Sequence, residues 1–223
     1  MQVYTFLICY VFIGTGCPIC LHYSQYLRIS MLQASLAFFL VLNALICLWE
    51  IGLGLHLKSI KMDYKRLSDK YGTKRLQAVV DLMMHDLQWY DIVSLQFWSR
   101  IWSTYSLYDP SYSNEESFGF FVDVGNGWTT LVPTLVFLYS MTYHNLIGAR
   151  WMGLIGLVKF YQEFYGTCIY FLSFFFNQRH VDKSVFEVVM FVGVSNGLWF
   201  VFPLIGMYAS YHLIETNSYA IFH

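Results

Sequence analysis

The feature that most constrains this chain is a long hydrophobic stretch near its C-terminal end, residues 186–214. At about 1.5 Å of helical rise per residue, this stretch is long enough to cross a bilayer core of roughly 30 Å. Asn196, Trp199 and Pro203 occupy positions i, i+3 and i+7, so they share one helical face. Such a face either forms hydrogen bonds to a neighbouring helix or lines a site within the membrane. The residues of the other segments provide the evidence for choosing between these two interpretations.

The composition indicates that several segments lie in a membrane. The 223 residues are 57% hydrophobic and only 12% charged, with a mean hydropathy of +0.48, whereas soluble domains carry about 25% charged residues. We predict an all-α integral membrane protein, a five-transmembrane-helix bundle with an intramembrane cavity, made of a single domain over residues 1–223. The predicted spans are 1–19, 31–57, 118–143, 149–176 and 186–214.

Between the second and third predicted spans lies a basic and interfacial insertion, residues 58–95. Its first part is either a partly helical segment at a membrane surface or a solvated charged loop. Of the 13 Lys and Arg residues, only Arg28, Arg150 and Lys159 fall outside the side that carries this insertion. The positive-inside rule therefore predicts that the basic side is cytoplasmic and that the C-terminus is lumenal.

Charge and cysteine content exclude some partners and sites. The net charge of −1 argues against nucleic acid as a partner. The partner that the apolar composition predicts is the lipid bilayer. The lone Cys17-x-x-Cys20 pair has no second pair to complete a zinc site, so we predict no metal. A homodimer is left open by these observations.

Three predicted spans contain an acid in their interior: Glu50, Asp123 and Glu163. A charge near the bilayer centre costs about 2.5–3.5 kcal/mol on insertion scales, so each acid is a functional hypothesis by default. Lys159 lies one turn before Glu163, and a structural ion pair is the alternative there. Glu50 and Asp123 have no local cation, and low-dielectric surroundings favour a neutral acid that can protonate an alkene or epoxide.

The aromatic side chain of Trp199 completes a chemical pattern. Its face could stabilise a carbocation without quenching it as water would. An acid, a base and an aromatic wall in a dry pocket are typical of sterol and terpenoid chemistry. The chain has no GxSxG, no HExxH and no glycine-rich phosphate loop, which argues against the corresponding hydrolases and nucleotide-binding enzymes.

Four segments carry a resemblance to a known family. Residues 102–112 read WSTYSLYDPSY, and Asp123 follows the last of these tyrosines by eleven positions. Residues 163–172 read EFYGTCIYFL, and residues 196–203 read NGLWFVFP. In order and spacing, these segments resemble the emopamil-binding protein family, the EXPERA-domain membrane proteins that include the sterol Δ8–Δ7 isomerases. The resemblance covers roughly residues 95–214, and more loosely Glu50.

The resemblance implies five helices around a cavity that opens to the bilayer, in a multi-pass protein of the endoplasmic reticulum. It implies proton transfer to a hydrophobic sterol or isoprenoid substrate without any cofactor. Glu50 and Asp123 would then be the catalytic acid–base pair. The residues implied in substrate binding are Asn126, Glu163, Tyr165, Asn196, Trp199, Trp102, Tyr105 and Asp109.

The chain also departs from the isomerases. Ile46 stands where they have a histidine, Asp123 is shorter than their glutamate, and Thr167 replaces an aspartate. Some fungal relatives in this family look like cyclases of farnesylated meroterpenoids. We therefore expect an intramolecular isomerase or terpenoid cyclase that rearranges a carbocation, by a double-bond shift or by ring closure. The alternative is a non-catalytic sterol- or lipid-binding or trafficking protein, like the sigma-two receptor branch.

Overall fold

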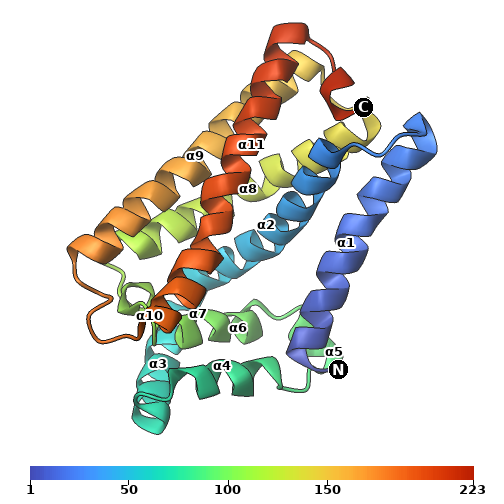
Figure 1. The fold of residues 1–223 in the computed structure, drawn as a ribbon. Coiled ribbons are helices and arrows are strands. Elements are labelled where there is room, and N and C mark those ends of the chain that lie inside the picture. The colour runs from blue at the N-terminus through green and yellow to red at the C-terminus, as the bar shows by residue number, and fades with distance from the viewer.

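The computed structural model describes residues 1–223 and is all-helical, which confirms the all-α part of the predicted fold class (Figure 1). The only β pairing is an isolated bridge between Gln2 and Asp86. Five long helices form the body of the molecule, and the loops between them alternate between its two ends. These helices are α1 (Val3–Tyr26), α2 (Met31–Leu55), α8 (Phe118–Tyr143), α9 (Ala149–Phe176) and α11 (Ser195–Thr216).

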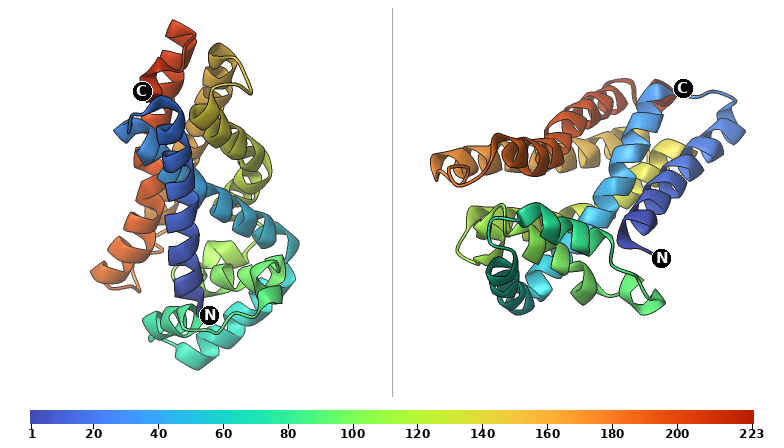
Figure 2. Two further views of the ribbon diagram at one scale, coloured as in Figure 1. Left: turned by 90° about the vertical axis from the view of Figure 1, so that its right-hand side faces the viewer. Right: turned by 60° about the horizontal axis from the view of Figure 1, so that its bottom comes forward.

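Five short helices and a 3-10 turn gather at the end of the bundle that holds the N-terminus (Figures 1 and 2). They are α3 (Leu57–Tyr71), α4 (Arg75–Met83), α5 (Trp89–Ile92), α6 (Leu95–Trp98), α7 (Arg100–Tyr105) and η1 (Pro110–Ser113). The basic segment thus forms two helices, which meet at Gly72 with a φ of +54° that glycine adopts without a steric penalty. Arg75 pairs with Asp182 at 2.7 Å and so joins α4 to the segment before the last span.

Three helical segments are long and apolar enough to cross a membrane: Val3–Tyr26, Met31–Leu55 and Val185–Thr216. They identify a membrane protein, and they account for three of the five predicted spans. Helices α8 and α9 have the predicted bounds, but they are not among the three segments that are apolar enough to cross a membrane. The first helix is longer than the predicted 1–19, because no glycine or proline follows Pro18 before the helix ends at Leu27 in the left-handed conformation.

The last span is not one continuous α-helix. It begins as α10 (Val185–Glu187), passes through the π-helical segment η2 (Val188–Val194) and continues as α11. A capping box between Ser184 and Glu187 fixes its start. The π-helical segment alters the helical register immediately before Asn196, which simple 3.6-residue periodicity does not predict.

Glycines set how closely the long helices approach one another. The most extensive packing joins α2 to α8 and α9 to α11. A Cβ atom at Gly127 would lie 2.7 Å from the Cβ of Glu50 and 2.8 Å from the carbonyl oxygen of Cys47. A Cβ atom at Gly206 would lie 2.5 Å from the Phe160 ring. Small residues at these points allow backbone-level contact between membrane helices, and the first contact occurs at the level of Glu50.

Candidate functional site

A cavity of about 200 Å³ lies where α2, α7, α8, α9 and α11 come together. Its lining combines aromatic and aliphatic side chains with a few polar groups, and it includes no lysine or arginine. Of the predicted site residues, those that line it are Glu50, Asp123, Asn126, Asn196, Trp199, Trp102 and Tyr105. Residues separated by up to 149 positions therefore meet at one place, since Glu50 and Trp199 are on α2 and α11.

Glu50 and Asp123 are the two acids of this cavity. Glu50 is only 4% exposed, and its Oε2 atom is buried without a hydrogen-bond partner. Asp123 lies on α8, close enough for its charge to repel that of Glu50. Like charges repel strongly in a low-dielectric site, so the state in which both acids are ionised is disfavoured.

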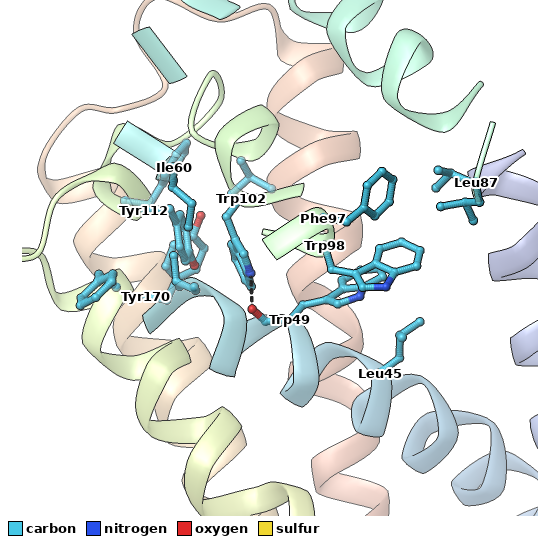
Figure 3. Close-up of a cluster of buried hydrophobic side chains, with 14 residues drawn as sticks. Leu45, Trp49, Ile60, Leu87, Phe97, Trp98, Trp102, Tyr112 and Tyr170 are labelled. Atoms are coloured by element: carbon cyan, nitrogen blue, oxygen red, sulfur yellow. Dashed lines mark hydrogen bonds between the residues drawn. The ribbon is translucent and has the colours of Figure 1, made fainter. Parts of the chain in front are cut away.

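Aromatic side chains form one wall of the same cavity, and Figure 3 shows Trp49, Trp102, Tyr112 and Tyr170 among them. Trp102 stacks on Tyr112, with ring centroids 5.1 Å apart and an interplanar angle of 24°. The indole Nε1 of Trp102 donates a hydrogen bond of 2.7 Å to the carbonyl oxygen of Trp49, the residue before Glu50. This bond fixes α7 against α2, so the wall is held at the height of the buried carboxyl group.

A hydrogen-bonded chain of polar groups borders the same cavity. The Asn196 side-chain amide donates to the Tyr105 hydroxyl at 3.0 Å and to the Val192 carbonyl oxygen at 2.9 Å. The Tyr105 hydroxyl is also 3.2 Å from that of Tyr170. Burial raises the pKa of Tyr105 to about 12 and that of Tyr112 well above its ordinary value. Both phenols therefore stay protonated at neutral pH and can donate hydrogen bonds.

The orientation of Trp199 is fixed by a second polar network. Its Nε1 donates to Asn43 Oδ1 at 2.8 Å, and Asn43 Nδ2 donates to Glu163 Oε1 at 2.7 Å and to Thr134 Oγ1 at 3.0 Å. Lys159 Nζ donates to both carboxylate oxygens of Glu163, at 2.7 and 2.8 Å. Glu163 was predicted to bind substrate, but the structure places it in this buried ion pair and not on the cavity lining.

Two other predicted binding residues lie away from the cavity. Asp109 is fully buried, accepts a hydrogen bond from the backbone of Ser111 at 2.9 Å and pairs with Arg179 at 3.1 Å, so it holds the segment before α10 against η1. Tyr165 is 52% exposed and stacks on Tyr161. It follows Glu163 by two residues, which is about 200° around a helix, and it therefore points outward.

Sequence reasoning did not select several residues that shape the site. Trp49, Tyr112 and Tyr170 line the cavity, and Asn43 orients Trp199. A signal was present for Asn43, which precedes Glu50 by seven positions and so shares its helical face. No comparable signal separates Trp49 from the other aromatic residues of this chain.

Comparison with known proteins assigns this chain to no family and no function. No protein-family model, no curated protein and no solved structure matches this chain. The resemblance to the EXPERA-domain family therefore rests on the quoted residues and their spacing.

Proposed function

We propose that this protein is a membrane-embedded, cofactor-independent isomerase or cyclase acting on a sterol or terpenoid. The observation that supports the proposal is the pair of carboxyl groups, Glu50 and Asp123, in one aromatic cavity without any basic residue. A buried acid whose Oε2 has no partner in the protein is free to exchange a proton with a bound substrate.

The proposed reaction is an internal rearrangement. One carboxylic acid donates a proton to a C=C bond or an epoxide, which forms a new C–H or O–H bond and leaves a carbocation. The faces of Trp199 and Trp102 stabilise this cation, because aromatic rings attract positive charge without adding to it as water does. The other carboxylate then removes a proton from a neighbouring carbon. The product is an isomer of the substrate, and either carboxyl group can act first.

The size of the cavity bears on the substrate. Sites for drug-sized ligands enclose roughly 300–1,000 Å³, whereas this cavity encloses about 200 Å³. Only the reacting portion of a sterol or an isoprenoid chain fits inside, and the remainder would lie along the bundle in the lipid. This arrangement suits an apolar substrate that reaches the site from the membrane.

We also infer that α8 and α9 complete a five-span bundle. With 26 and 28 residues, these helices are about 39 and 42 Å long, enough to cross a bilayer core beside α2 and α11. The N-terminus and the basic helices α3 and α4 gather at one end, which the positive-inside rule assigns to the cytoplasm. The endoplasmic reticulum is the proposed location, because sterol and isoprenoid substrates of the resembled family are processed there.

Deuterium incorporation tests the proposal directly. Microsomes that contain the chain are incubated in D₂O with a Δ8-sterol, and separately with an epoxidised farnesyl substrate. Because the first step adds a solvent-exchangeable proton, the expected product is an isomer with one deuterium bound to carbon after double-bond protonation, or to the new hydroxyl after epoxide opening. The hydroxyl deuterium exchanges back in H₂O, so the epoxide reaction is followed by chromatographic separation of the ring-closed isomer.

Paired variants separate catalysis from lipid binding. Glu50→Gln and Asp123→Asn should each lower product formation by about 10²- to 10⁴-fold, whereas Glu116→Gln, which alters an exposed acid outside the cavity, should not. If the native protein retains a photoreactive sterol but forms no product from either substrate class, the protein is a binding or trafficking protein and the catalytic proposal fails.

A further inference from the structure

Three histidines meet at the end of the bundle opposite the N-terminus. His22 lies on α1, His144 follows the last residue of α8, and His223 follows the 3-10 turn η3 (Ala220–Phe222). One ring nitrogen from each lies within 4.8 Å of the other two. Figure 1 shows the C-terminus at this end, far from the helices α3–α7, of which α7 borders the carboxylate cavity.

The fold holds these rings in place by aromatic packing. Tyr219 stacks on His144 with centroids 4.7 Å apart and rings nearly parallel, and its hydroxyl donates to the Ile147 carbonyl oxygen at 2.8 Å. Tyr26 packs against both His144 and His223, at 4.6 and 4.5 Å. The C-terminal turn is therefore anchored to the ends of α1 and α8.

A hydrogen bond to the backbone assigns the proton of the His144 ring. His144 Nε2 is 3.0 Å from the Met141 carbonyl oxygen, and because a carbonyl only accepts, this nitrogen carries the proton. In the neutral ring, Nδ1 of His144 then has a free lone pair, and it lies 3.4 Å from Nε2 of His223. His22 is 1% exposed, and its Nε2 atom is buried without a hydrogen-bond partner. An outer hydrogen bond that fixes the tautomer of one ring is typical of histidines that bind metals.

The sequence predicted no metal; on the geometry of these three rings we instead propose that His22, His144 and His223 form a binding site for a late first-row divalent metal ion, with Zn²⁺ as the reference ion. Three imidazoles suit Zn²⁺, Cu²⁺ or Ni²⁺, whereas Ca²⁺ and Mg²⁺ take oxygen ligands. In a tetrahedral zinc site with Zn–N bonds of roughly 2.0–2.1 Å, two ligand nitrogens lie about 3.3 Å apart. The 3.4 Å between His144 and His223 matches that separation.

The site would join α1 and the C-terminal turn to α8. These three segments are far apart in the sequence, and a shared metal would resist their separation, because an ion that binds only the folded state stabilises it. The inference concerns the end of the molecule opposite the carboxylate cavity and does not depend on the proposed reaction.

Metal binding is measured on the full chain in detergent, purified through a tag other than polyhistidine and stripped with a chelator. We expect one Zn²⁺ per chain by elemental analysis, a rise in the melting temperature with Zn²⁺ but not with Mg²⁺, and visible absorption bands of tetrahedral Co²⁺. Since loss of an outer-sphere partner lowers metal affinity 10–100-fold, loss of a ligand in His223→Gln should lower it by more than about 100-fold.

The variants are chosen so that misfolding does not decide the result. His223 is exposed at the end of the described chain, so His223→Gln should leave the melting temperature of the metal-free protein unchanged. His212→Gln changes a histidine of α11 outside the cluster and should bind Zn²⁺ like the native chain. If the native protein takes up no stoichiometric Zn²⁺, or if His223→Gln and His22→Gln bind it unchanged, the histidines form only an aromatic stack with an imidazole–imidazole hydrogen bond, and the proposal is overturned.

Discussion

Two buried glutamates, Glu50 on α2 and Glu163 on α9, show two ways of placing an acid inside a helical bundle. Glu163 accepts hydrogen bonds from Lys159 and Asn43, so its carboxylate is neutralised and satisfied. Glu50 is equally buried, but its Oε2 has no partner and a second acid faces the same cavity. An acid in a span therefore indicates a reactive site only when the structure leaves it without a cation.

Trp199 lies between these two regions and links them. Its ring lines the cavity with the unpartnered acid, while its indole nitrogen bonds to Asn43 of the ion-pair network. The network can thus be understood as a rigid support that positions one wall of the cavity. The predictions below test this division of roles.

The largest effect is expected for Glu50→Gln. This change keeps the size of the side chain and removes the transferable proton, so turnover should fall by about 10²- to 10⁴-fold, the usual contribution of a general acid or base. The melting temperature should stay the same or rise, because a neutral amide is less costly to bury than a charge. Deuterium incorporation and thermal unfolding in detergent measure the two quantities. Retained turnover would remove Glu50 from the reaction.

Lys159→Met should have the largest effect on stability. It leaves Glu163 as an uncompensated buried charge, and breaking a buried ion pair in this way costs about 3–5 kcal/mol in the free energy of unfolding. The double variant Lys159→Met/Glu163→Gln should recover much of that loss. Denaturant titration of both proteins in mixed micelles provides the comparison. Equal stabilities for the single and double variants would show that the ion pair does not govern this region.

Gly127→Ala tests the contact between α2 and α8 beside Glu50. The added methyl group would meet Glu50 and Cys47 closer than van der Waals contact allows, and such overpacking typically costs about 1–3 kcal/mol. Gly125 is the matched control, because a Cβ atom there meets nothing within 4 Å. Gly125→Ala should be neutral or stabilising by up to about 1 kcal/mol. If both variants unfold at the same denaturant concentration, the close approach at Gly127 is not required.

Trp199→Phe should have the smallest effect. It keeps an aromatic face toward the cavity but leaves the Asn43 oxygen unpaired, so we expect a loss of about 1 kcal/mol in stability and less than a tenfold loss of turnover. Trp199→Ala removes the face as well, and should lower turnover far more than it lowers the melting temperature. Equal turnover in the two variants would exclude stabilisation of a cation by this ring.

The residues at which the long helices begin and end were the part of the fold that the sequence predicted best. The bounds of α8 and α9 follow from runs of apolar residues between polar turns, and Ser117 as the N-cap of α8 is a local signal. The π-helical segment before Asn196 was not predictable in this way, because its hydrogen bonding depends on packing in the bundle.

The chemical character of the candidate site could be predicted from the sequence, but the set of residues that form it could not. Glu50, Asp123, Asn196 and Trp199 were selected because polar groups in apolar helices are costly and rare. Asp109 was implied by the family resemblance, yet it pairs with Arg179, a residue 70 positions away that no local pattern connects to it.

The sequence by itself determined that the chain is helical and apolar enough for a membrane, because hydrophobicity and helical periodicity are local properties. Only the tertiary structure decided which acids are neutralised, which face the cavity and which histidines meet. These outcomes depend on distances between residues on different helices. His22, His144 and His223 lie more than 70 positions apart and show no common motif, so only the packing of α1, α8 and the C-terminal turn brings their ring nitrogens together.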